Sequence, residues 1–309
     1  MATTLIAVVI ALALGHAAPA FARSARDYGW FGNWLRWLDE KLLEGEGFWR
    51  GRYGIVVALL PPLLVVLLFQ LALGERLLGL AGLVFGVAVL FYAWGPRDLD
   101  VDVEAIVEAP DAAARREAVA RLWPEGAAFA EDGRVPDGPL LVEAVFRNAL
   151  RRWFGVLFWF LLLGPVGALG YRLVQLSAEG EASRALPGEN AAGARWLLSL
   201  LEWPVAQLMT LAMALVGNFD SVLGAWKDNG GADLQVGHAF LGAAARASVR
   251  SELADEAMEY VEEGVAPSRA LVRQLGELPE LRDAMSLVWR ILLLWLAVLA
   301  LFVIAGFVS

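Results

Sequence analysis

The sequence predicts an all-α, polytopic membrane protein with about six transmembrane helices and helical cytoplasmic loops. Apolar residues make up 59% of the 309 residues, charged residues only 19%, and the mean hydropathy is +0.57. Ordinary soluble domains are about half apolar and a quarter charged. Several of the 13 tryptophans flank apolar runs, where interfacial anchors are common. These deviations indicate a chain that is solvated largely by lipid.

Six apolar stretches have the length of a membrane span. A bilayer core about 30 Å thick needs about 20 apolar residues in a helix, and backbone exposed to lipid must satisfy its own hydrogen bonds. Glu202 interrupts the fifth stretch, Arg290 marks the start of the sixth, and Pro61-Pro62 should kink the second. We therefore expect one membrane domain over 1–309, with spans at about 2–22, 54–73, 77–95, 153–171, 196–217 and 288–308.

The distribution of Lys and Arg predicts the orientation. Twenty of the 25 cationic residues lie in segments 23–53, 96–152 and 218–287, whereas Arg76, Arg172, Arg184 and Arg195 lie in the segments between them. Cytoplasmic loops carry the excess of positive charge. The prediction is a multi-pass protein of a bacterial inner (plasma) membrane with both termini in the periplasm.

Two features near the N-terminus bear on this topology. Ala20-Phe21-Ala22 resembles a signal-peptidase site, but no basic region precedes the apolar run, so we expect residues 1–22 to stay attached as a span. Trp30, Trp34 and Trp37 recur at helical spacing with charged residues on the other faces. This pattern predicts an amphipathic helix lying in the cytoplasmic interface.

Composition excludes several classes of function. A formal charge of −9 with no basic stripe argues against a nucleic-acid partner. There is no cysteine, and His16 and His238 are the only histidines, so thiolate and histidine-rich metal sites are excluded and no metal is expected. Walker, nucleophile-elbow, zincin and Rossmann signatures are absent. The predicted partners are the lipid bilayer and an unidentified small anionic ligand or protein.

The first candidate site lies where the fourth span begins. It comprises Glu143, Arg147, Asn148, Arg151 and Arg152. Residues four apart share a helix face, and arginines with an amide can grip an anionic ligand by charge-assisted hydrogen bonds. The alternative is a surface Glu143–Arg147 pair followed by arginines that anchor the helix to headgroups.

The second candidate is an acid inside a span. Glu202, followed by Gln207, lies in the fifth span, and an ionisable residue within a membrane indicates function by default. Because Glu202 lies only about two turns from the expected outer end, the alternative is a side chain that reaches the headgroups.

Several motifs resemble a known family. The run Arg151-Arg-Trp-Phe-Gly-Val-Leu-Phe-Trp-Phe, continuing through Gly-Ala-Leu-Gly-Tyr-Arg172, resembles the hallmark of the AmpE family, inner-membrane proteins linked to β-lactamase induction. Leu201-Glu-Trp-Pro-Val-Ala-Gln-Leu208 and Ala214-Leu-Val-Gly-Asn218 fit its later segments. That family is similar in turn to the cobinamide-phosphate synthases (CbiB/CobD), membrane enzymes of cobalamin biosynthesis. Glu143, Asn148 and Tyr171-Arg172 occupy positions that match motifs of the synthases.

The departures from the synthase pattern decide between the functions that the resemblance implies. The synthases follow the asparagine with Phe-Val-Asp-Gly, whereas this chain has Ala149-Leu-Arg-Arg152, so Arg151 replaces the acid. We therefore expect a regulatory or sensory protein of β-lactamase induction and peptidoglycan recycling, without a cofactor. The alternative is a synthase-like ligase that uses a magnesium nucleotide. A transporter is less favoured, because no inverted repeat is visible.

The predicted topology also limits which residues can meet. A fourth span over 153–171 would separate Tyr171 and Arg172 from Glu143 and Asn148 by about 30 Å, at about 1.5 Å per helical residue. We therefore expect other cytoplasmic residues, such as Asp220 and Lys227, to complete a site at Glu143 and Asn148.

Overall fold

A computed structural model describes residues 2–17, 26–42, 48–73, 79–95, 98–123, 137–180, 182–233, 236–262 and 278–305. Every regular element in these ranges is helical, which confirms the all-α prediction. Residues 18–25, which include the signal-peptidase-like Ala20-Phe21-Ala22, lie outside the described residues.

The chain divides into two compact units. The first unit comprises residues 1–97, 151–205 and 299–309, and the second comprises residues 98–150 and 206–298. The single membrane domain that we expected over 1–309 remains a prediction. The first unit contains α1 (Ala2–Ala17), α3 (Gly29–Leu42), η1 (Phe48–Arg50), α4 (Ile55–Leu73), α5 (Leu80–Ala93), α10 (Gly155–Leu163), α11 (Pro165–Ala178) and η5 (Ala182–Ala185). The second contains α6 (Leu99–Val107), α7 (Ala112–Leu122), α9 (Gly138–Ala149), α13 (Phe219–Asp228) and α14 (Ala239–Glu262).

Three elements reach the boundary between the units. They are the π-helical turn η4 (Leu150–Phe154), α12 (Gly188–Val216) and α16 (Pro279–Ile304). The helix is continuous from α9 through η4 into α10. π-helical turns occur inside α-helices frequently at functional sites, and this one carries Arg151 and Arg152.

Within the ranges that the structure describes, three helices are long and apolar enough to cross a membrane, so the chain is a multi-pass membrane protein. They are α4, α12 and α16, and the shorter apolar helices are Leu5–Leu14 and Leu80–Ala93. On α4, the side chains of Leu60, Leu64, Leu68 and Leu71 are each more than half exposed, as expected for a surface in contact with lipid.

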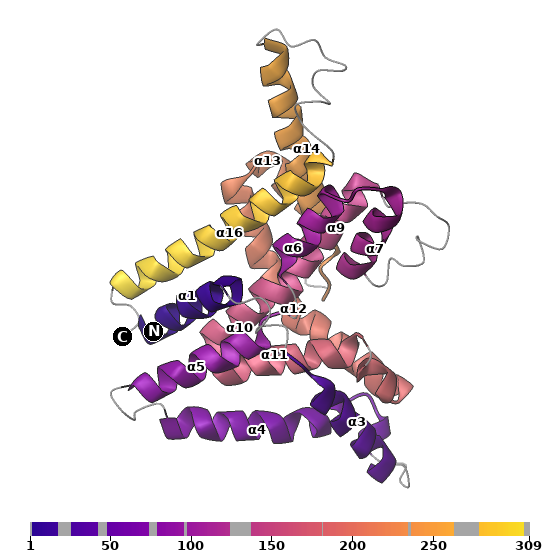
Figure 1. Cartoon of the computed structure of the whole chain (residues 1–309), viewed down its shortest axis with the longest axis vertical. Helices are drawn as coiled ribbons and strands as arrows, with labels where there is room; N and C mark the ends of the chain where they lie inside the picture. The colour runs from indigo at the N-terminus through magenta and orange to yellow at the C-terminus, as the bar shows by residue number, and fades with distance from the viewer. Residues whose placement is uncertain are drawn as a thin grey trace. The chain divides into compact units, whose positions relative to one another are not determined.

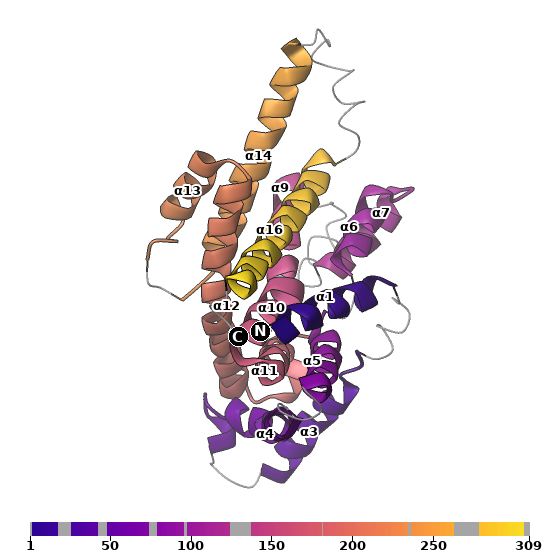
Figure 2. The same cartoon turned by 90° about the vertical axis from the view of Figure 1, so that its left-hand side faces the viewer.

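The first unit is built around α5 and α11 (Figures 1 and 2). α5 packs against α1, α4, α10 and α11, and α11 packs against α4 as well. Val156, Phe160, Ala168 and Leu173 are at most 3% exposed and form the core between α10 and α11.

The predicted fourth span over 153–171 is wrong as a single helix. Gly164, with φ 73° and ψ −155°, ends α10, and Pro165 starts α11. A left-handed φ favours glycine, and proline suits the first turn of a helix. A Cβ on Gly155 would lie 2.3 Å from Cζ of Tyr171, and one on Gly167 would lie 2.2 Å from the carbonyl oxygen of Trp159. α10 and α11 therefore fold back on each other as a tight antiparallel hairpin.

The start of α12 packs against the segment that precedes α4. The amide of Asn190 donates to the carbonyl of Trp49 at 2.9 Å, and Asn190 is fully buried. A Cβ on Gly193 would lie 1.7 Å from the carbonyl oxygen of Arg52, whose guanidinium lies 4.8 Å above the ring of Trp196. The segment before α4 and the start of α12 are thus at the same end of the first unit. The expectation that they lie on opposite sides of the membrane is therefore wrong.

The second unit is a packed set of helices. α14 packs against α9 and α13, and α6 packs against α7. Asp111 caps α7, since its carboxylate accepts from the backbone N–H groups of Ala113 and Ala114. Trp289 Nε1 donates to Asp100 at 2.9 Å and joins α16 to α6.

Candidate functional site

The predicted site residues fall in both units, and each group is described within its own unit. Glu143, Arg147, Asn148 and Gln207 belong to the second unit, whereas Arg151, Arg152 and Glu202 belong to the first.

Glu143 forms an ion pair with Arg246 of α14, a partner other than the Arg147 that helical spacing offered. The side chains of Glu143 and Arg246 are 24% and 32% exposed, so the pair is only partly buried. α14 can approach α9 because Gly242 has no side chain, and a Cβ there would lie 2.9 Å from Cγ of Glu143. Sequence spacing could not reveal this partner, which is 103 residues away along the chain.

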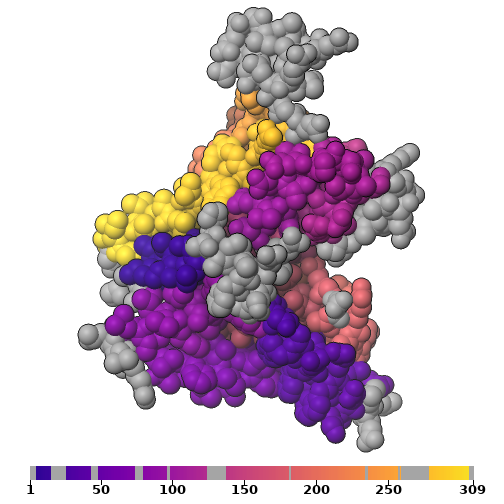
Figure 3. All heavy atoms as spheres, viewed as in Figure 1, coloured from indigo at the N-terminus to yellow at the C-terminus, as the bar shows by residue number. Residues whose placement is uncertain are grey.

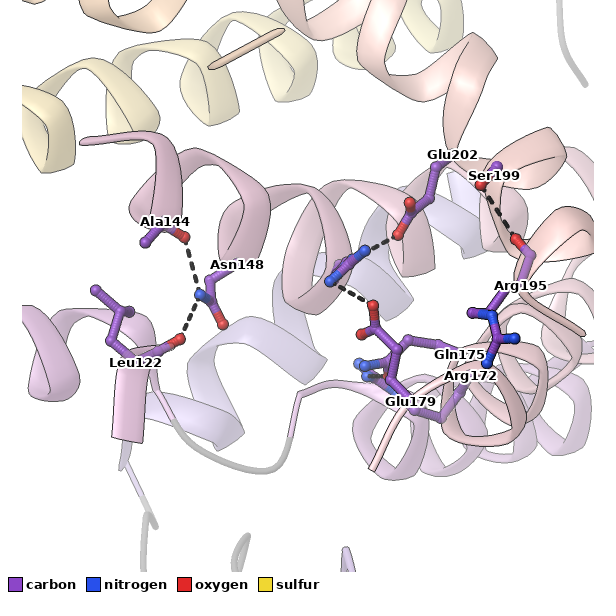
Figure 4. Close-up of polar contacts among 10 residues, drawn as sticks. Leu122, Ala144, Asn148, Arg172, Gln175, Glu179, Arg195, Ser199 and Glu202 are labelled. Atoms are coloured by element: carbon purple, nitrogen blue, oxygen red, sulfur yellow. Dashed lines mark hydrogen bonds and ion pairs between the residues drawn. The ribbon is translucent and has the colours of Figure 1, made fainter. Parts of the chain in front are cut away.

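Asn148 and Arg147 serve the packing of α9 against α7. The Asn148 amide donates to the carbonyls of Leu122 at 2.7 Å and Ala144 at 2.8 Å (Figure 4). The Arg147 guanidinium lies 5.8 Å from the centre of the Trp123 ring, within the range of a cation–π interaction. The side-chain NH₂ of Asn148 therefore donates both of its hydrogen bonds to backbone carbonyls, one on α7 and one on α9.

A small pocket lies beside the Glu143–Arg246 pair. It has a volume of about 130 Å³, with Pro139, Val142, Val249 and Leu253 as its apolar lining. Its polar lining comes from Arg246, Arg250 and Glu280. Asp220 and Lys227, which we expected to complete the site, lie on α13 and do not line this pocket. The pocket therefore combines apolar side chains with two guanidinium groups that lie one helical turn apart on α14.

Gln207 of α12 forms hydrogen bonds with α13 and with the loop that follows it. Its carbonyl accepts from Nε1 of Trp226 at 2.8 Å, and its amide donates to the carbonyl of Gly231 at 2.8 Å. Gly231 lies against the Trp226 ring, where a Cβ would be 2.1 Å from Cδ1. These contacts give Gln207 a structural role in the second unit.

In the first unit, Arg151 bridges two carboxylates. Arg151 Nε donates to Glu202 at 2.8 Å, and Arg151 Nη1 lies 2.7 Å from Glu179, the residue that ends α11. Figure 4 shows Glu179 and Glu202 turned toward one guanidinium from two different helices. The Glu202 side chain is fully buried. A buried carboxylate needs a charged partner, and Arg151 supplies it.

Two further arginines converge on the C-terminal end of α5. Arg172, 1% exposed, donates from Nε to the carbonyl of Ala93 at 2.7 Å and also bonds the side chain of Gln175. Arg26 donates to the carbonyls of Phe91 at 3.0 Å and Gly95 at 2.8 Å. Cations at a helix C-terminus satisfy its last carbonyls and complement its dipole.

Tyr171 and Arg172 therefore lie elsewhere than predicted. The hairpin at Gly164 returns Tyr171 to Gly155, one turn beyond Arg151, so the single fourth span from which the separation was calculated is wrong. The glycine-proline pair Gly164-Pro165 was the signal for this reversal. Glycine and proline interrupt a helix even inside an apolar run.

Comparisons with known proteins identify a family for the N-terminal part of the chain. The family model described as CobD/Cbib protein matches residues 4–178. No curated protein and no solved structure matches the chain. The matched part includes Glu143, Asn148, Arg151 and Arg172, and it ends before Glu179, Glu202 and Arg246. Of the two predicted functions, the match by itself favours the synthase-like ligase, because the matched family is related to the cobinamide-phosphate synthases. The match does not bear on a role in β-lactamase induction.

Proposed function

Because the chain belongs to the CobD/CbiB family, we propose that it is a membrane-embedded member that binds a small anionic ligand and signals its presence. The role is regulatory, in β-lactamase induction and peptidoglycan recycling, as the AmpE-like motifs of the sequence imply. This proposal rests on the pocket beside the Glu143–Arg246 pair.

The pocket beside Glu143 and Arg246 carries the proposal. Arg246 and Arg250 are one turn apart on α14 and line a pocket with an apolar floor. Arginines bind carboxylates and phosphates through paired, charge-assisted hydrogen bonds. Glu143 neutralises Arg246 in the ligand-free protein, so an anion that takes its place would release Glu143. Ligand binding would thereby change a contact between α9 and α14, which is the change a sensor needs.

The charge at position 151 is opposite to that in the synthases, which supports a role other than that of a ligase. Arg151 stands where the synthases carry an acid, and it is held by Glu179 and Glu202. The residues do not fit a metal nucleotide well, because the carboxylates of Glu143, Glu179 and Glu202 each contact an arginine. We therefore assign no catalytic step to this chain.

A ligase is the second candidate, and the family match is the observation that favours it. Glu143, Asn148, Tyr171 and Arg172 keep the residue types of the synthase motifs. A ligase would have to restore cobalamin-dependent growth to a strain that lacks its own synthase. Restored growth would refute the regulatory proposal and establish the ligase.

The membrane arrangement that we propose has four complete crossings, α1, α4, α5 and α16, and the α10–α11 hairpin as a re-entrant segment. The start of α12 contacts Trp49 and Arg52, which belong to the cation-rich segment 23–53. The segment after α12, 218–287, is cation-rich as well, so we place both ends of α12 on the cytoplasmic side. Although α12 is long and apolar enough to cross a membrane, it does not cross it in this arrangement. Its apolar window is 44% buried, against 17% in α4 and 22% in α16, as suits a helix that is packed in protein.

This arrangement improves the distribution of charge and keeps both termini periplasmic. Arg172, Arg184 and Arg195 move to the cytoplasmic side, which leaves Arg76 as the cation of the periplasmic segments. The positive-inside preference is therefore stronger than with six complete spans.

The pocket proposal is tested by β-lactamase induction in a strain whose own copy is replaced by variants. Arg250→Gln removes one guanidinium from the pocket and should abolish induction, while the protein inserts and accumulates normally. Lys227→Gln, a matched loss of one cation on α13, should induce like the parent. If both variants induce normally, the pocket is not the signalling site.

A further inference from the structure

A groove between α3 and α4 in the first unit is unrelated to the pocket described above. It has a volume of about 490 Å³ and is lined by Trp30, Asn33, Trp34 and Trp37 of α3 and by Pro61, Pro62 and Val65 of α4. Figure 3 shows the surfaces of α3 and α4 meeting at the lower right of the view. Trp30 and Trp37 are 43% and 47% exposed, so large aromatic surfaces remain uncovered.

The double proline of α4 determines the geometry of this groove. In an α-helix the N–H of residue 62 would donate to the carbonyl of residue 58, but proline has no N–H. Trp34 Nε1 takes that place and donates to the carbonyl of Ala58 at 3.0 Å. The bond anchors α3 against α4 and fixes the Trp34 ring, which stacks on Trp37 at a centroid distance of 5.1 Å. A flat aromatic wall thus faces two prolines.

Charged side chains of α3 flank its tryptophan face. Arg36 donates to the side chain of Asn33, so a guanidinium lies at the edge of the groove. Lys41, one turn after Trp37, and Glu40 are exposed. Asp39 turns to the opposite side, where it accepts from Nε1 of Trp49 at 3.0 Å. Arg36, Glu40 and Lys41 together give this edge one net positive charge.

We propose that the groove binds one anionic glycerophospholipid. An acyl chain lies between the tryptophans and Pro61-Pro62, and the phosphate contacts Arg36, Asn33 and Lys41. Three properties select this occupant. The groove borders on the exposed leucines of a membrane span, tryptophan prefers the level of the headgroups, and cationic side chains there attract anionic lipid.

The affinity difference follows from the charge. One net positive charge near the headgroups should favour phosphatidylglycerol over phosphatidylcholine by about fivefold. An interfacial amphipathic helix with tryptophans on its apolar face and cations at the edge has the composition for such binding. The proposal does not depend on the signalling function or on the ligand of the second unit.

Quenching by brominated lipids tests the site in nanodiscs. Brominated phosphatidylglycerol should quench the tryptophan fluorescence of the parent protein more than brominated phosphatidylcholine does at equal mole fraction. Trp37→Phe should remove much of this difference in quenching. The paired variant Arg36→Gln with Lys41→Gln should bring the two lipids to equal quenching, whereas Lys227→Gln should leave the preference intact. Equal quenching of the parent by both lipids would overturn the proposal.

A second variant separates this groove from other lipid contacts. Val65→Trp fills the groove without changing any charge, and it should reduce the phosphatidylglycerol that stays bound to the purified protein in native mass spectrometry. The same retained amount in Val65→Trp and in the parent would place the lipid elsewhere and refute the site.

Discussion

Arg151 and Glu202, 51 residues apart in sequence, are joined by a hydrogen bond of 2.8 Å between Nε and a buried carboxylate. With a straight fourth span, the two residues would lie near opposite faces of the membrane. The reversal of the chain at Gly164 and the contact of α12 with the segment before α4 bring them to one end of the first unit. Four predictions test this part of the structure and its surroundings.

Removing one partner of the buried ion pair should destabilise the protein. Glu202→Gln or Arg151→Met leaves the other charge without its main partner, and loss of about 3 kcal/mol of stability is expected from such changes. The double variant Arg151→Met with Glu202→Met removes both charges and should be more stable than Arg151→Met alone. Thermal unfolding in one detergent measures all of them, and additive losses in the double variant would contradict a coupled pair.

The close approach of α10 and α11 predicts different effects at two neighbouring glycines. Gly167→Ala places a Cβ 2.2 Å from the carbonyl oxygen of Trp159 and should reduce stability by about 2 kcal/mol, the order found for overpacking. Gly170→Ala is the control, because its Cβ would meet Leu63 side-chain carbons at 3.5 Å and 3.6 Å, ordinary contact distances. Helix propensity then favours alanine there. Equal melting temperatures for the two variants would argue against the hairpin.

The re-entrant arrangement predicts the accessibility of η5. The protein has no cysteine, so Ser183→Cys introduces a single thiol for labelling. A membrane-impermeant maleimide should label it in inverted vesicles and leave it unlabelled in intact spheroplasts. Ser309→Cys, at the end that we place in the periplasm, should show the reverse pattern. Labelling of Ser183→Cys from the periplasmic side would refute the re-entrant arrangement.

Tyr28 should carry a pH dependence of stability in the alkaline range. Burial raises the pKa of Tyr28 to about 12, against opposing effects from Arg172 and Arg26, while an unfolded tyrosine titrates near 10. The folded state therefore holds this proton more tightly. Its contribution to stability is complete below pH 10 and is lost as the pH rises through 12.

The phenolate absorbance measures this effect. The parent should show a tyrosine phase near pH 12, and Tyr28→Phe should lose amplitude in that phase. Tyr53→Phe is the control, because Tyr53 is 59% exposed. A phase near pH 12 with unchanged amplitude in Tyr28→Phe would assign it to another tyrosine.

Local sequence patterns account for the properties that depend on composition and on near neighbours. Long apolar runs required helices in a membrane, because lipid cannot satisfy exposed backbone groups, and α4 ends at the predicted residue, Leu73. Asp111 caps α7 and Asp137 precedes α9, and such helix starts depend on near neighbours. The motifs around Glu143, Asn148 and Tyr171-Arg172 indicated the CobD/CbiB family by residue type and spacing alone.

The partners of the charged residues, in contrast, follow from the packing of distant segments. Glu143 pairs with Arg246 and Glu202 with Arg151, over 103 and 51 residues, and no periodicity encodes such distant pairs. The hydropathy of 153–171 is the same for one span and for two short antiparallel helices. The close packing of Gly155 on Tyr171 and Gly167 on Trp159 selects the hairpin. Hydropathy determines whether a segment leaves water, whereas the steric fit between particular residues determines where the chain turns.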